Sequence, residues 1–161
     1  MNLSTFTWIH TVLSLGAIVA GFVVVIGMQR RQASPSWIAA FLASAVATSV
    51  TGFGFPFDHF LPSHWVGVIS LVVLGLAILG HYVFGQSALG RSIYLMGSII
   101  GLYLLVFVLI AQAFLKVPAL HALAPTQTEP AFAIAQIAAL IVFIILGIAA
   151  ARASRPRPAV V

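Results

Sequence analysis

The chain has 161 residues, of which 62% are hydrophobic and only 6% are charged, whereas a soluble domain carries roughly 25% charged residues. The formal net charge of +5 comes from arginines in short segments between apolar runs. Such segments form no basic face interleaved with aromatic residues, so we expect no nucleic acid as a partner. Because the chain has no cysteine, disulfides, iron–sulfur clusters, thiolate zinc sites and cysteine nucleophiles are excluded. We expect a single transmembrane domain over residues 1–161, surrounded by the lipid bilayer.

Five apolar segments have about the 20 residues that are needed to cross the hydrocarbon layer of a bilayer. The first has no basic residue before it, unlike a cleaved signal peptide with a charged start. The second opens with Ser34 and Pro35, a favourable N-cap and first turn, and Pro56 marks its end. The predicted fold class is therefore all-α, an integral membrane bundle of five transmembrane helices. The predicted spans are residues 8–28, 35–55, 63–84, 92–115 and 130–151, each approximate at its ends.

Charged residues are sorted between alternate gaps in this pattern. One set of gaps, together with the C-terminal tail, holds only arginines: Arg30, Arg31, Arg91, Arg152, Arg155 and Arg157. The other set holds Asp58, Glu129 and the single lysine, Lys116. Since short cytoplasmic loops retain Lys and Arg, the pattern predicts an N-terminus outside and a C-terminus in the cytoplasm.

Small residues recur at helical spacing within the spans. Gly97 and Gly101 form a GxxxG pair in the fourth span, and such pairs let helices approach closely in a membrane. Packing within the chain is the favoured interpretation. A face for a membrane-protein partner or for a homo-oligomer is the alternative.

Polar side chains gather at the predicted outer ends of the spans, where they suggest a periplasm-facing pocket. Neutral imidazole is a common ligand of zinc, copper and iron, and carboxylates complete such sites. The candidate metal ligands are His10, His59, His64, His121, Asp58 and Glu129. Thr48, Thr51, Gln112 and Gln136 are the expected polar lining of the pocket.

His10 and His64 are the best candidates for binding a cofactor, because both enter spans at comparable depth. They predict either a single heme b or a transition metal. A diheme cytochrome is excluded, since His81 lies 17 positions beyond His64, about 25 Å along a helix, and has no second imidazole at its depth.

Simpler interpretations remain open for each candidate. Histidine suits a water–lipid interface, Asp58 suits a turn, and Glu129 complements the dipole of the fifth helix. Gln112 and Gln136 are able to hydrogen-bond each other across helices.

The function classes that remain are a redox or binding module, a structural or accessory membrane subunit, and an oligomeric small-solute or ion transporter. No Ser-His-Asp order, Gly-rich phosphate loop or HExxH motif is present, so we do not favour an enzyme. Both acidic residues lie in predicted loops, which argues against a buried proton relay.

Two segments carry a resemblance to a known group of proteins. They are Thr51–Asp58 followed by Leu61–His64, and Lys116–Leu120 followed by Ala124–Gln127. Both are similar to segments of an uncharacterised family of small multi-spanning bacterial inner-membrane proteins, over most of the chain. The resemblance implies the bacterial inner membrane as the location and implies nothing about ligands.

Overall fold

The computed structural model describes residues 2–56, 62–85 and 87–154, and every regular element in these ranges is helical. The elements in chain order are α1 (Leu3–Gln29), α2 (Pro35–Gly52), α3 (Pro62–Ile78), the π-helical turn η1 (Leu79–Val83), α4 (Ala88–Lys116), α5 (Pro118–Leu123) and α6 (Pro130–Ala153). Within these ranges five helices are long and apolar enough to cross a membrane, with α3 and η1 together forming the third. The all-α class and the five apolar helices are thereby confirmed.

Several helices begin or end at other residues than the approximate predicted spans, for reasons that lie in local capping. α1 begins at Leu3 because the side chain of Asn2 accepts a hydrogen bond from the Thr5 amide at 2.8 Å. α4 begins before residue 92 because the Ser87 hydroxyl accepts from the Gly90 amide at 2.9 Å. α2 ends at Gly52 rather than at residue 55.

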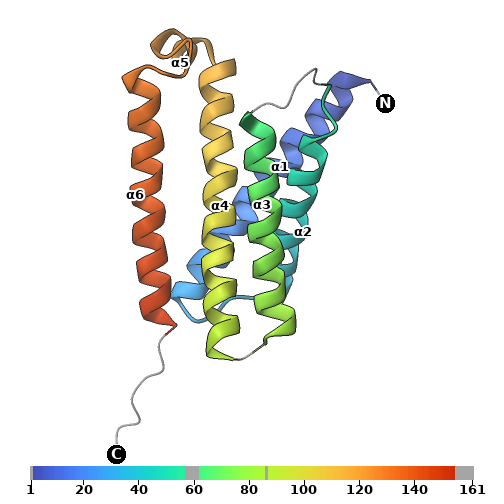
Figure 1. Ribbon diagram of the computed structural model, residues 1–161, viewed down its shortest axis with the longest axis vertical. Coiled ribbons are helices and arrows are strands. Elements are labelled where there is room, and N and C mark those ends of the chain that lie inside the picture. Colours follow the sequence, from blue (N-terminus) through green and yellow to red (C-terminus); the bar gives the residue numbers. More distant parts are fainter. Residues whose placement is uncertain (1, 57–61, 86, 155–161) are drawn as a thin grey trace, which may run out of the picture.

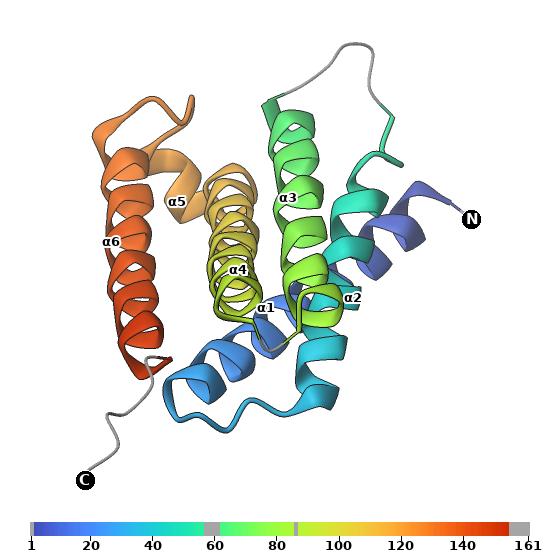
Figure 2. The same cartoon turned by 60° about the horizontal axis from the view of Figure 1, so that its bottom comes forward.

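The five long helices run alternately up and down, and α4 lies at the centre of the bundle (Figure 1). α4 contacts α1, α2, α3 and α6, whereas α6 packs mainly against α4 and α1. α1 crosses obliquely beneath α4, from the side of α2 toward the foot of α6 (Figure 2). α4 is thus the helix that all four other long helices contact.

The core lies where α1, α2, α3 and α4 meet. Phe41, Leu74 and Leu102 are fully buried there. A Cβ atom added to Gly21 would lie 2.6 Å from Leu102 Cδ1 and 2.8 Å from the Phe41 ring. Glycine therefore suits this crossing, because a side chain at position 21 would force Leu102 or Phe41 to shift.

The GxxxG pair of Gly97 and Gly101 packs two helices of the same chain against each other. A Cβ at Gly97 would lie 2.8 Å from the Ala77 Cβ and 3.0 Å from the Val73 carbonyl oxygen, and a Cβ at Gly101 would lie 2.8 Å from Leu74. Both glycines thus bring α4 against α3, which agrees with the favoured interpretation of the motif.

The turn from α1 to α2 has the hydrogen bonds of a Schellman motif. The Arg31 amide donates to the Met28 carbonyl at 3.2 Å, and the Gln32 amide donates to the Gly27 carbonyl at 2.8 Å. Glycine usually occupies the left-handed position of this motif, but here Arg31 has φ of +58°. A non-glycine residue in this conformation costs about 1 kcal/mol.

We expect Gly97→Ala to destabilise the protein by about 1–3 kcal/mol, because the added methyl group meets backbone atoms of α3 rather than a movable side chain. The matched control is Gly16→Ala, since nothing lies within 4 Å of a Cβ at Gly16. That control should be neutral or slightly stabilising. Unfolding of the detergent-purified variants measures both effects, and equal stability of the two would contradict the assigned packing.

Candidate functional site

A cavity of about 710 Å³ lies between α1, α2, α3 and α4, at the end of the bundle that holds Lys116. We call it the large cavity. Its walls are mainly apolar, with Ile18, Leu104 and Val108 among them. Such a volume with a few convergent polar groups is typical of small-molecule sites. Its polar lining comprises Thr7, His10, Thr11, Ser14, Thr48, Ser49, Ser63, His64, Ser70, Gln112 and Lys116.

The contact with Thr51 favours one tautomer of His10. The Thr51 hydroxyl donates to the Ala47 carbonyl at 2.7 Å, so its single proton is used within α2. The Thr51 oxygen also lies 2.8 Å from His10 Nδ1, and while Thr51 donates to Ala47 this contact requires a protonated Nδ1 as the donor. The other nitrogen, Nε2, keeps its lone pair. An imidazole held in this way at one nitrogen is the usual arrangement of a metal ligand.

Aromatic rings hold both cavity histidines in place. The Phe55 ring meets His10 edge-on, with ring centroids 5.1 Å apart, and the Phe53 ring stacks on His64 at 5.5 Å. Phe53 in turn lies on Gly67, where a Cβ would be 3.0 Å from the ring. His64 is only 5% exposed. The two imidazoles are thus positioned by the segment that follows α2.

The charge in the described lining of the large cavity is positive. Lys116 is the single charged side chain in its described lining, and α4 ends at this residue. Thr48 is 7% exposed, and among the described residues its hydroxyl has no hydrogen-bond partner. The cavity therefore offers one cation, two imidazoles and one unused hydroxyl to a ligand.

The predicted lining is brought together only in part. His10, His64, Thr48 and Gln112 line the large cavity, and Thr51 contacts it through His10. His121, in α5, and Glu129, before α6, lie outside the lining. Asp58 and His59 lie outside the described residues. In the part of the chain that the structure describes, no three metal-binding side chains cluster together.

Gln136 and Glu129 have structural partners instead. The Gln136 amide donates to the Phe107 carbonyl of α4 at 3.1 Å, and Gln112 lies in the cavity lining, so the predicted pairing of the two glutamines does not form. Glu129 accepts hydrogen bonds from the Thr126 hydroxyl at 2.9 Å and from the amides of Thr126 and Thr128. Desolvation raises the pKa of Glu129, but these bonds and its own backbone amide outweigh that effect and lower the pKa below its usual value.

Several lining residues were not predicted as part of the site. Phe53 and Phe55 are the most important, because they fix the two imidazoles. Their signal was the run Gly52–Phe57, in which aromatic residues alternate with Gly and Pro directly after an apolar span. The hydroxyls of Ser14 and Ser49 donate to carbonyls one turn back, at 2.7 and 3.0 Å, and are therefore already occupied.

The described residues define an all-helical protein with five helices long and apolar enough to cross a membrane, four of which line the large cavity. No protein-family model matches the chain, and no curated protein sequence or solved structure matches it either. Function is therefore inferred from the cavity and its lining.

We expect Thr51→Val to release the tautomer of His10, because valine keeps the shape of threonine but removes the acceptor for Nδ1–H. In the native protein, ¹⁵N NMR of labelled histidine should show His10 protonated at Nδ1 alone. In the Thr51→Val variant both tautomers should appear. Thr51→Ser, which keeps the hydroxyl, is the control. Protonation at Nε2 in the native protein would contradict the assignment.

Proposed function

We propose that the chain is an integral protein of the bacterial inner membrane, with its N-terminus outside and its C-terminus in the cytoplasm. The distribution of charge supports this topology. Arg30, Arg31, Arg91 and Arg152 lie at one end of the bundle, and Lys116 and Glu129 lie at the other. Arginine-rich short connections favour the cytoplasmic side. The resemblance to small bacterial inner-membrane proteins points to the same location and stays a prediction.

Tryptophan placement also supports a bilayer position. Trp8 and Trp65 lie toward the end with the large cavity, and Trp37 lies at the opposite end. All three rings are exposed, between 46% and 69%. Exposed tryptophans at both ends of apolar helices are typical of the membrane interfaces.

Cysteine labelling tests this topology cleanly, because the native chain has no cysteine. Ser4→Cys and Ser36→Cys each place one thiol at an exposed position, at opposite ends of the bundle. In intact spheroplasts, a membrane-impermeant maleimide should label the Ser4→Cys variant and not the Ser36→Cys variant. After lysis it should label both. The reverse pattern would contradict the proposed orientation.

We further propose that the large cavity binds one amphipathic small molecule, with heme b as the ligand that fits its chemistry best. The carrying observation is that His10 and His64, on two different helices, line one apolar cavity together with Lys116. Heme iron requires only two axial ligands, and its carboxylates pair with a cation. The function is then a membrane-embedded redox or binding module.

A bare transition-metal ion is the weaker alternative. Protein sites for such ions use three or four protein ligands, and the described lining contains two imidazoles and no carboxylate. A third ligand would have to come from Asp58 or His59, which lie outside the described residues. Heme needs no such addition.

Hemin titration into the detergent-purified protein tests the assignment. We expect a Soret band and, after reduction, the sharp visible bands of a six-coordinate heme. His10→Ala and His64→Ala should each weaken binding by at least about tenfold, since even outer-shell changes cost 10–100-fold at metal sites.

His121→Ala is the matched control, because this histidine is exposed and lies outside the cavity lining. It should bind hemin as the native protein does. Binding that survives in both cavity variants, or the absence of a Soret band in the native protein, would overturn the heme assignment. Elemental analysis of the same sample tests the bare-metal alternative.

A further inference from the structure

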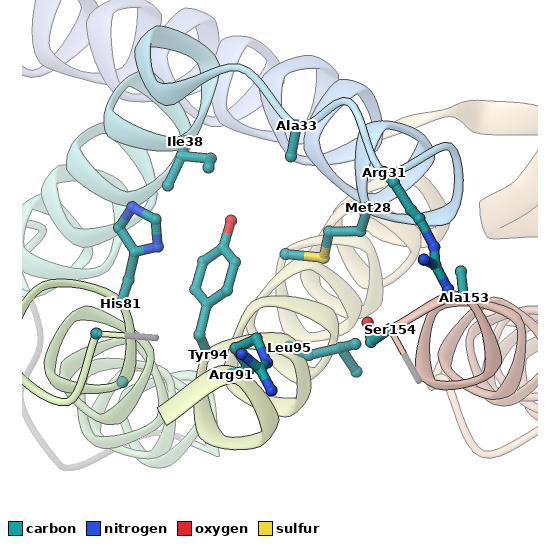
Figure 3. A pocket seen from close by; sticks show the side chains of 12 residues that line it. Met28, Arg31, Ala33, Ile38, His81, Arg91, Tyr94, Leu95, Ala153 and Ser154 are labelled. Carbon is teal, nitrogen blue, oxygen red and sulfur yellow. The ribbon is translucent and has the colours of Figure 1, made fainter. Parts of the chain in front are cut away.

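A second cavity, of about 430 Å³, lies at the opposite end of the bundle from the large cavity. We call it the small cavity. The α1–α2 turn, η1, the start of α4 and the end of α6 together form its walls (Figure 3). The exposed residues of its described lining are Arg31, Arg91 and Ser154. All three are polar and lie in a turn or near helix ends, so this cavity opens toward water.

The large cavity is bordered by exposed residues of a different kind. Trp8 and Leu15 of α1 and Leu109 of α4 line this cavity, and all three side chains are exposed. A side chain that lines a cavity and also reaches the outer surface of the bundle lies at the rim of that cavity. The large cavity is therefore open to the side, between α1 and α4.

The burial pattern of α1 and α4 agrees with this opening. All residues of the two helices are described, and every buried residue of α1 lies between Ala17 and Met28. In α4, burial ends at Leu105 and returns only at Phe114, whose ring packs edge-on against Phe132 of α6. Figures 1 and 2 both show the start of α1 beside α2 and away from the last turns of α4. The two helices thus separate toward the end that holds the large cavity.

The wall opposite this opening is buried. It is formed by polar residues of α2 and α3, namely Thr48, Ser49, His64 and Ser70. The lining also has exposed residues at the water end of the cavity, Pro56 and Ser63. Entry from water is therefore the route that competes with entry from the side.

The rim between α1 and α4 changes in polarity with depth. Trp8, Gln112 and Lys116 lie at its outer end, where tryptophan rings and lysine ammonium groups suit the membrane interface. Leu15 is seven positions beyond Trp8, and Leu109 is seven positions before Lys116. Seven positions are about 10 Å along a helix, so the deeper part of the rim is apolar and faces hydrocarbon in the proposed membrane position. Such an opening fits a molecule that is itself embedded in one leaflet.

We propose that the ligand of the large cavity is dissolved in the membrane and enters the cavity sideways from the outer leaflet, between α1 and α4. Its polar group stays near Lys116 while its apolar part passes between Leu15 and Leu109. This inference rests on the proposed function, because it takes over the membrane topology and the large cavity as the binding site. It narrows the ligand to lipid-soluble amphipathic molecules, a class to which heme b belongs.

Photolabelling of the native protein in phosphatidylcholine liposomes tests the opening without hemin. The probe is a phosphatidylcholine with a diazirine in the middle of one acyl chain, and mass spectrometry identifies the labelled residues. We expect labelling of Ile18 and Leu105, which line the large cavity and are each only 8% exposed. Ile99 is the matched control, since it lies on α4 like Leu105, is 6% exposed and lies outside both linings. It should stay unlabelled, whereas Val12, which is exposed and outside both linings, should be labelled in any case.

Leu15→Trp separates the opening from a general looseness of the bundle. The larger ring at this exposed rim position narrows the opening, so the labelling of Ile18 and Leu105 should be largely lost. Val19→Trp is the control, because Val19 lies one turn further along α1, is also exposed and lies outside the cavity lining. It should leave the labelling unchanged.

Labelling of Val12 without Ile18 and Leu105 would overturn the proposal, and so would equal labelling in the two tryptophan variants or at Ile99 and Leu105. Hemin titration of the same preparation keeps the two proposals apart. Hemin binding without cavity labelling would retain the heme assignment and overturn the sideways entry. Cavity labelling without a Soret band would overturn heme b as the ligand and support the entry of another membrane-dissolved molecule.

Discussion

The close approach of α4 to its neighbours determines the rest of the structure. Gly90 and Gly97 let α4 meet backbone atoms of η1 and α3, and Gly101 and Gly21 make room for the side chains of Leu74, Leu102 and Phe41. Beyond Gly101 α4 has no further glycine, and its residues between Leu104 and Lys116 supply one wall of the large cavity. The large cavity thus begins beyond the last glycine of α4. Helix packing in an apolar solvent depends on such contacts, because burial of apolar surface no longer drives association there.

The apolar surroundings of the helices also explain how much of the fold and of the site could be predicted from the sequence. Helix number and type follow from apolar length, since a chain in hydrocarbon must satisfy its backbone hydrogen bonds internally. His10, His64, Thr48 and Gln112 line one cavity, and their similar depth along the spans can be counted from the sequence. Helix order cannot be counted in this way. His121 and Glu129 have a depth similar to that of His10 but lie on connections near α6, which is not part of the large cavity.

Side-chain roles were less predictable than positions, because they depend on hydrogen bonds that compete locally. Thr48 and Thr51 are one helical turn apart on α2, and the sequence treats them alike. Thr51 donates to the backbone of its own helix and lies 2.8 Å from His10 Nδ1, whereas Thr48 has no partner among the described residues. Gln136 likewise bonds to the backbone of α4 rather than to Gln112. For Thr51 and Gln136 the partner is a backbone carbonyl group, whose position cannot be read from the residue types.

The contrast between the two cavities follows from the position of α6. This helix packs on α4 and α1 through a narrow strip that includes Phe143 and Ala150, and it leaves residues such as Ile134 and Ile145 exposed. Its last turn supplies Ala153 and Ser154 to the small cavity, but α6 contributes nothing to the large one. α1 crosses beneath α4 (Figure 2) and meets α6 through its last third, where the Phe22 and Phe143 rings lie 6.0 Å apart. The large cavity is therefore a property of the first four long helices, and the small cavity is completed by the fifth.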